Sequence, residues 1–71
     1  MSKPTAYYSL LVRFDEFDTW SIQFGDYDRE VVQDELTEYE GNCFAVKIIS
    51  TPDDQASIDL VVDNMNRELE V

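Results

Sequence analysis

The stretch FGDYDREVVQDELTEYEG, residues 24–41, predicts a helix that connects two strands, and this connection decides the fold. Asp28 suits an N-cap because its carboxylate can accept a hydrogen bond from a free backbone N–H of the first turn. Apolar side chains then recur at helical spacing, as Val32, Leu36 and Tyr39. Gly41 can adopt the left-handed conformation that commonly ends a helix. We therefore predict a helix over residues 28–40.

Three other segments have the aromatic, aliphatic and β-branched composition of strands. They are residues 7–14, 19–24 and 43–49. Residues 15–18 form the turn of a hairpin between the first two strands, and Gly25 ends the second. Alternation places one apolar set on a common face, namely Tyr8, Leu10, Val12, Phe14, Trp20, Ile22, Phe24, Phe44, Val46 and Ile48. Phe17 at the hairpin tip is expected to fold back onto the core, and partner binding is its alternative role.

Residues 50–55 read STPDDQ and predict the start of a second helix. Thr51 has the side chain of an N-cap, and Pro52 suits the first helical position because its missing N–H would have no partner there. The two aspartates that follow complement the positive end of the helix dipole. Apolar residues then recur with helical period, so we predict a second helix over residues 52–69.

The order strand, strand, helix, strand, helix predicts an α+β fold. We expect one small domain over residues 1–71, with residues 1–6 as a loose lead-in. The expected architecture is a three-stranded sheet with both helices packed on one face. The segment from the second strand through the first helix to the third strand is long enough for a crossover, which would be right-handed if these two strands run parallel. The third strand then lies beside the first strand and parallel to the second. A fully antiparallel meander, with the third strand on the other edge, is the alternative.

The charge of the chain restricts its partners. Five basic residues face sixteen acidic residues, and the formal net charge is −11. Such a field repels nucleic acids and anionic membranes and attracts basic surfaces, so we expect no direct nucleic-acid or membrane binding. The single cysteine excludes an intrachain disulfide. Because no segment resembles a signal peptide or the roughly 20 apolar residues of a membrane span, we expect a cytoplasmic protein.

The residue types argue against an enzyme. The chain contains no histidine, which removes the usual general base and metal ligand. Cys43 suits a small apolar filler. Asp26 and Asp28 lie beside a turn, but an EF-hand loop from Asp26 would need glycine and glutamate where the chain has Val31 and Thr37. We predict no catalytic residue, no metal site and no cofactor, and a looser cation site at these two aspartates is the alternative.

Acidic residues without interspersed lysines line both predicted helices. Glu30, Asp34 and Glu38 follow one another at i, i+4 and i+8 of the first helix, where like charges repel. We predict that such residues bind a basic partner protein, and a purely solubilising surface is the alternative. Carboxylates about 6 Å apart resemble the phosphates of one nucleic-acid strand, so one form of the hypothesis is a nucleic-acid mimic. The predicted partner-binding residues are Glu30, Asp34, Glu35, Glu38, Asp59 and Asp63.

If both helices cover one face of the sheet, the other face is open and offers a second surface. Its residues are Tyr7, Leu11, Arg13, Ala45, Lys47 and Ile49. This patch is partly apolar and holds two of the five basic residues. One interpretation is a solvated face along which the stems of arginine and lysine lie. The other is a homodimer formed through this face or through an edge strand.

Two blocks, QFGDYDREVV at residues 23–32 and KIISTPDDQASIDLVVDNMN at residues 47–66, resemble short uncharacterised acidic proteins encoded by bacteriophages and prophages. The resemblance covers most of the chain from Tyr8 to Asn66. Acidic mini-proteins of phages, as a class, include inhibitors of host restriction, CRISPR or transcription proteins. The resemblance therefore implies a non-enzymatic inhibitor of a basic, nucleic-acid-binding host protein. The alternative is a structural or accessory module that self-associates through its open sheet face.

Overall fold

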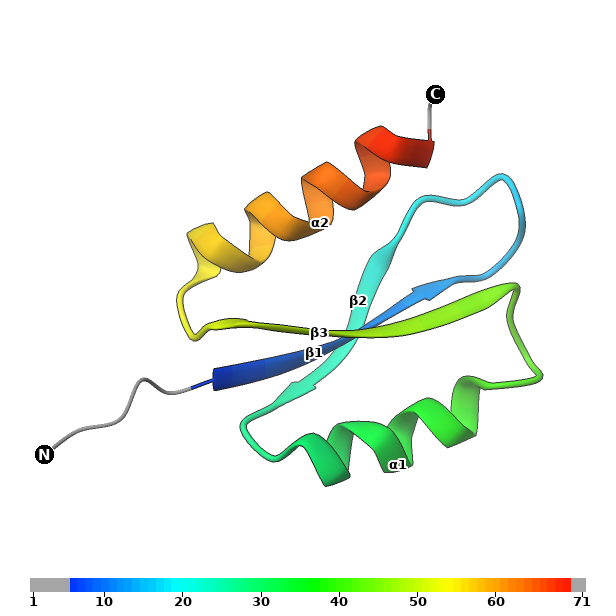
Figure 1. Ribbon diagram of the computed structural model, residues 1–71. Helices are drawn as coiled ribbons and strands as arrows, with labels where there is room; N and C mark the ends of the chain where they lie inside the picture. The colour runs from blue at the N-terminus through cyan, green and yellow to red at the C-terminus, as the bar shows by residue number, and fades with distance from the viewer. Residues whose placement is uncertain (1–5, 70–71) are drawn as a thin grey trace, which may run out of the picture.

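The computed structural model describes residues 6–69 and shows a three-stranded sheet between two helices (Figure 1). The strands are β1 (Ala6–Arg13), β2 (Ser21–Asp26) and β3 (Ala45–Pro52), and the helices are α1 (Arg29–Tyr39) and α2 (Gln55–Leu69). The predicted α+β class and the element order are confirmed. The predicted lead-in lies outside the described residues except for Ala6, which begins β1.

Strand β1 occupies the centre of the sheet, in the order β2-β1-β3. It pairs antiparallel with both neighbours, so β2 and β3 run parallel to each other on either side of it. The predicted position of the third strand beside the first is confirmed, and the alternative meander is wrong. The segment containing α1 therefore crosses from one edge of the sheet to the other.

One face of the sheet packs against α1. Leu10 and Val12 of β1 and Val32 and Leu36 of α1 form its buried core. Partly buried side chains surround this core: Tyr8, Phe24, Tyr39, Cys43, Val46 and Ile48. Full burial of one such aliphatic side chain stabilises a fold by about 1.5–3 kcal/mol, so this small cluster is a main source of stability.

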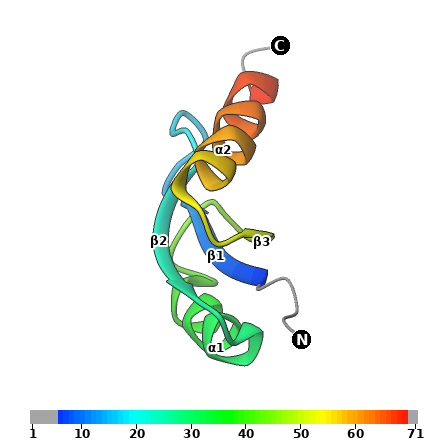
Figure 2. The same cartoon turned by 90° about the vertical axis from the view of Figure 1, so that its left-hand side faces the viewer.

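Helix α2 covers the opposite face, so the expectation that both helices pack on one face is wrong. Ser9 and Leu11 point away from the α1 side, yet neither has exposed surface. Ile58 of α2 is also buried. Two perpendicular views show the sheet passing between the helices (Figures 1 and 2). The physical reason is the run of apolar residues at Leu10, Leu11 and Val12, which requires cover on both faces of β1.

A β-bulge divides the apolar side chains of β2 between the two faces. Leu10 pairs with Phe24 and Leu11 pairs with Ile22, which leaves Gln23 as an extra residue. Such a bulge interrupts the alternation of side chains. Phe24 therefore packs on the α1 core, whereas Ile22 lies on the side of Leu11. The prediction that the apolar residues of this strand share one face is wrong.

Gly25 lies inside β2, so the prediction that it ends this strand is wrong. A Cβ atom at this position would come within 2.7 Å of Cζ of Tyr7, whose ring lies close to the glycine. The Tyr7 ring also contacts the Tyr27 ring edge to face, with centroids 5.0 Å apart. A larger residue at position 25 would therefore displace the Tyr7 ring from this place.

Helix α2 begins three residues later than predicted, at Gln55, because β3 continues through Pro52 in register with β1. Asp54 takes the capping role: its carboxylate accepts hydrogen bonds from the Ser57 N–H at 2.8 Å and the Ser57 hydroxyl at 2.9 Å. These bonds favour the ionised form and lower the pKa of Asp54. Thr51, the predicted cap, is buried and donates its hydroxyl to the carbonyl of Pro52.

Arg13 fixes the hairpin turn between β1 and β2. Its Nε donates to the carbonyl of Asp18 at 2.9 Å, and its Nη2 donates to the carbonyl of Glu16 at 2.7 Å. The guanidinium also lies 4.9 Å from the centre of the Phe44 ring. Phe17 at the tip is 89 % exposed, so the expectation that it folds back onto the core is wrong.

Candidate protein-binding surface

The two ends of α1 are fixed by local hydrogen bonds. Asp28 accepts a hydrogen bond from the N–H of Glu30 at 2.9 Å, which confirms the predicted N-cap. At the other end Gly41 has a φ of 95°, and the side chain of Asn42 donates to the carbonyl of Glu38 at 3.2 Å. These contacts set the residues at which the helix begins and ends.

Burial of Val32 and Leu36 against the sheet turns the acidic residues of α1 towards solvent. Glu30, Asp34 and Glu38 lie on the opposite side of the helix and are exposed. We call these three residues the α1 acidic row. Glu35 is half-buried at the margin between the row and the core.

The acidic residues of α2 belong to a different surface. Asp59 and Asp63 are exposed, and Asp59 accepts a hydrogen bond from the side-chain amide of Gln55 at 2.9 Å. Because α1 and α2 lie on opposite sides of the sheet, the structure does not bring these residues to the α1 acidic row (Figure 1). One flat partner surface cannot contact both sets at once.

The alternative interface predicted on the sheet lacks the open face on which it depended. Leu11 and Ile49 are buried, and Tyr7 is half-buried beside Gly25. Arg13 donates hydrogen bonds to backbone carbonyl groups of the hairpin turn. Of the six residues predicted on this face, Lys47 alone is exposed.

Asp26, Asp28 and Cys43, which were considered for metal binding or catalysis, make hydrogen bonds within the fold. Within residues 6–69, no group of three histidine, cysteine, aspartate or glutamate residues could hold a metal ion. Asp26 accepts a hydrogen bond from the N–H of Asp28 at 2.8 Å, so both aspartates serve the start of α1. The Cys43 thiol is half-buried and donates to the carbonyl of Tyr39 at 3.2 Å. Neither helix in this range has the length and hydropathy to cross a membrane.

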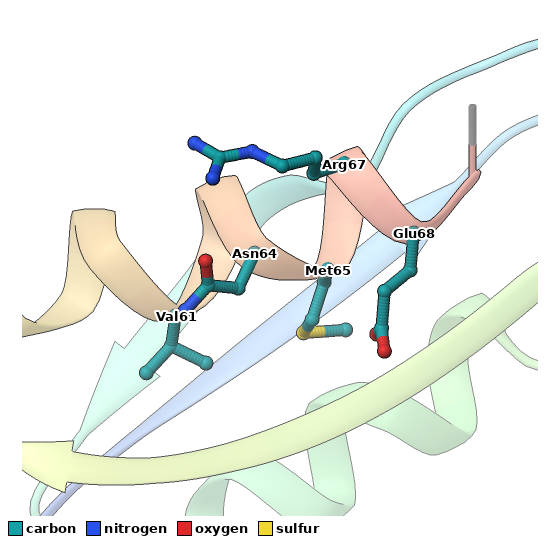
Figure 3. A pocket seen from close by; sticks show the side chains of 5 residues that line it. All are labelled: Val61, Asn64, Met65, Arg67 and Glu68. Carbon is teal, nitrogen blue, oxygen red and sulfur yellow. The ribbon is translucent and has the colours of Figure 1, made fainter. Parts of the chain in front are cut away.

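A depression of about 580 Å³ on α2 was not foreseen from the sequence. It is lined by Val61, Asn64, Met65, Arg67 and Glu68. Figure 3 shows Val61, Met65 and Glu68 pointing to the side of α2 on which β3 passes. Apolar residues recur with helical period along α2, but Ile58 is the one buried residue of this helix. Val61, Val62 and Met65 are half-buried, and Leu69 is exposed, so much of the apolar side of α2 is only partly covered.

Comparison with known proteins finds no match to this chain among family models, curated proteins or solved structures.

Proposed function

We propose that this protein is a non-enzymatic binding module whose α1 acidic row engages a basic surface of a partner protein. The observation that supports this proposal is the arrangement of the row, which is exposed and lies opposite the buried side of α1. The net charge of −11 would draw a basic surface towards the chain from a distance.

The positions of the charged residues on α1 lower the stability of this helix. Each like-charged pair at i, i+4 costs about 0.2–0.5 kcal/mol. Glu38 lies near the negative end of the helix dipole, where no basic residue is present in the last turn. Arg29, at the first position, lies near the positive end. Folding alone therefore does not account for this arrangement, whereas binding of a cationic partner would offset its cost.

The partner class we propose is a nucleic-acid-binding protein of a host cell, bound in the cytoplasm. Carboxylates about 6 Å apart along α1 can occupy cationic sites that otherwise hold successive phosphates. Release of counterions would then contribute to binding, and affinity would fall steeply with added salt, as it does for DNA. A phage origin, which we infer from the two sequence blocks alone, would make the partner a host protein, and inhibition would follow from occupancy of its groove.

Two triple variants with the same change of charge test the proposal. The test variant neutralises the α1 acidic row with Glu30→Gln, Asp34→Asn and Glu38→Gln. The control neutralises three exposed acids elsewhere with Glu16→Gln, Asp59→Asn and Asp63→Asn. The immobilised natural chain would first capture partners from host lysate at low and at high salt. The affinity of a captured and purified partner would then be measured for all three chains.

We expect the test variant to bind at least about tenfold more weakly, which corresponds to about 1.4 kcal/mol, and to show a shallower dependence on salt. The control should change affinity by much less. Equal losses in the two variants would show that only net charge matters, and unchanged binding in the test variant would exclude the row as the binding surface.

A further inference from the structure

Strand β3 is a regular edge of the sheet. Within the described residues it pairs with β1 alone, over consecutive positions from Ala45 to Pro52 and with no register shift. The other edge, β2, is shorter and contains the bulge at Gln23. Bulges and short length protect an edge, whereas a long regular edge presents a row of unpaired backbone N–H and C=O groups. Lys47 and Pro52 are features that also limit pairing at an edge, so the regular stretch of β3 that can accept another strand is the part before Pro52.

The depression on α2 lies on the flank of the helix nearer to this edge. Asn66 hydrogen-bonds to Trp20 just before β2, so that flank of α2 is directed towards the opposite edge of the sheet. Val61 and Met65 lie on a different side of the helix, towards β3 (Figure 3). Both are half-buried and line the depression. A strand added to β3 would therefore meet an apolar surface of α2 as well as free backbone groups.

The charges around this edge suit a second copy of the chain. Lys47 of β3 and Arg67 of α2 are exposed and are two of the five basic residues of the chain. Acidic residues are also present, since Glu68 lines the depression and Asp53 directly follows β3. When two β3 strands pair antiparallel, Lys47 of each copy approaches the acidic end of the other strand. This surface is self-complementary, whereas the α1 acidic row of one copy repels that of another.

We propose that two copies of the chain pair antiparallel through their β3 edges and form a continuous six-stranded sheet. The contact is isologous, because the same residues of both copies meet around a twofold axis. The axis is perpendicular to the sheet, so the two α2 helices lie side by side on one face with their depressions towards each other. Both α1 acidic rows then lie on the other face. The pairing does not depend on the function proposed for α1.

Sedimentation equilibrium of the full chain, from low micromolar to millimolar concentration, measures the pairing. We expect the mass to rise from 8.3 kDa to twice that value. Added salt should strengthen the dimer, because it screens the repulsion between two copies of net charge −11. Binding of a basic partner to the α1 acidic row has the opposite salt dependence, so failure of one proposal is distinguishable from failure of the other.

Two pairs of variants locate the contact. Val61→Asp places a charge in the depression, and its control, Leu60→Asp, places the same charge on the adjacent residue, which is 62 % exposed. Lys47→Glu alters the edge itself without burying a charge. Its control, Arg29→Glu, makes the same change of net charge on α1. Circular dichroism would verify that each variant is folded.

We expect Val61→Asp and Lys47→Glu each to weaken the dimer at least about tenfold, and the controls to change it by less than about threefold. Backbone amides of β3 should become more protected from hydrogen exchange as the concentration of the natural chain rises. A monomer at every concentration would overturn the proposal. So would a dimer that is unaffected by both variants, or protection of β3 that appears only when a different protein is added.

Discussion

Replacing Asn66 by alanine tests how α2 is attached to the rest of the protein. The side-chain Oδ1 of Asn66 accepts a hydrogen bond from the N–H of Trp20 at 2.6 Å, and its amide group donates to the carbonyl of Trp20 at 3.3 Å. One side chain thus satisfies both backbone groups of the residue that precedes β2. Because Ile58 is the one buried residue of α2, we expect these two bonds to be a major part of its attachment.

The expected loss follows from the number and environment of these bonds. A neutral hydrogen bond contributes about 0.5–1.5 kcal/mol net, and a donor left unpaired away from water costs about 1–3 kcal/mol. Both bonds are partly buried, and the longer one is near the limit of useful geometry. We therefore expect Asn66→Ala to lower the free energy of unfolding by about 2 kcal/mol. With a urea m-value of about 1 kcal/mol per molar, the midpoint falls by about 2 M.

The assay is urea unfolding followed by far-UV circular dichroism and by fluorescence of Trp20, the one tryptophan of the chain. Low micromolar protein keeps self-association out of the measurement. The matched control is Asn64→Ala on the same helix, which has the same gain in helix propensity at an exposed position and should change stability by less than about 0.5 kcal/mol. Asn66→Asp, which keeps the acceptor and loses the donor, should have an intermediate effect. If Asn66→Ala and Asn64→Ala agree within about 0.5 kcal/mol, the attachment of α2 does not depend on these bonds.

Three further substitutions test the sheet and the N-terminal cap of α2. Ser9→Ala should raise the free energy of unfolding by about 1 kcal/mol in urea titrations, because the Ser9 hydroxyl is buried and has no hydrogen-bond partner among residues 6–69; a loss would show that the hydroxyl is satisfied in solution. Gly25→Ala should destabilise the protein by at least about 1 kcal/mol through its clash with the Tyr7 ring, and the same change in a Tyr7→Ala background should cost far less, so additive effects in this double-mutant cycle would contradict the proposed clash. The lowered pKa of Asp54 means that its carboxylate stabilises the fold above the ordinary value of 3.8 and loses this contribution as pH falls through the lower folded value. Asp54→Asn should therefore reduce stability at neutral pH but not at strongly acidic pH, and a difference from the natural chain that stays constant with pH would count against this role.

Local signals were sufficient to predict α1. Its cap, Asp28, and its terminating residue, Gly41, act through contacts within a few residues, so their roles do not depend on the rest of the fold. The start of α2 depended instead on whether Pro52 belongs to the helix or to the preceding strand. Pro52 suits both a first helical turn and the end of an edge strand, and pairing of β3 with β1 selected the strand. Asp54 then capped the helix from the next available position.

For the candidate binding residues, too, some features were predictable from local signals and others depended on the tertiary structure. Exposure of the α1 acidic row was predictable, because it follows from helical period once Val32 and Leu36 are known to be buried. The separation of Asp59 and Asp63 from that row was not predictable, since it depends on which face of the sheet α2 covers. The depression beside Met65 was not predictable either, because the apolar period indicates which side of a helix faces the core and says nothing of how closely that side approaches it.

The sequence by itself determined the element order, the limits of α1 and the outward direction of its acidic row, and it favoured the third strand beside the first over a meander. Periodicity and capping residues decide the elements and their limits, and both act along the chain. The tertiary structure alone decided that α2 covers the second face and that the bulge at Gln23 sends Ile22 to that face. The reason is that burial of Leu11, in the central strand, depends on segments far from it in the sequence, and neighbouring residues do not specify which segment provides the cover.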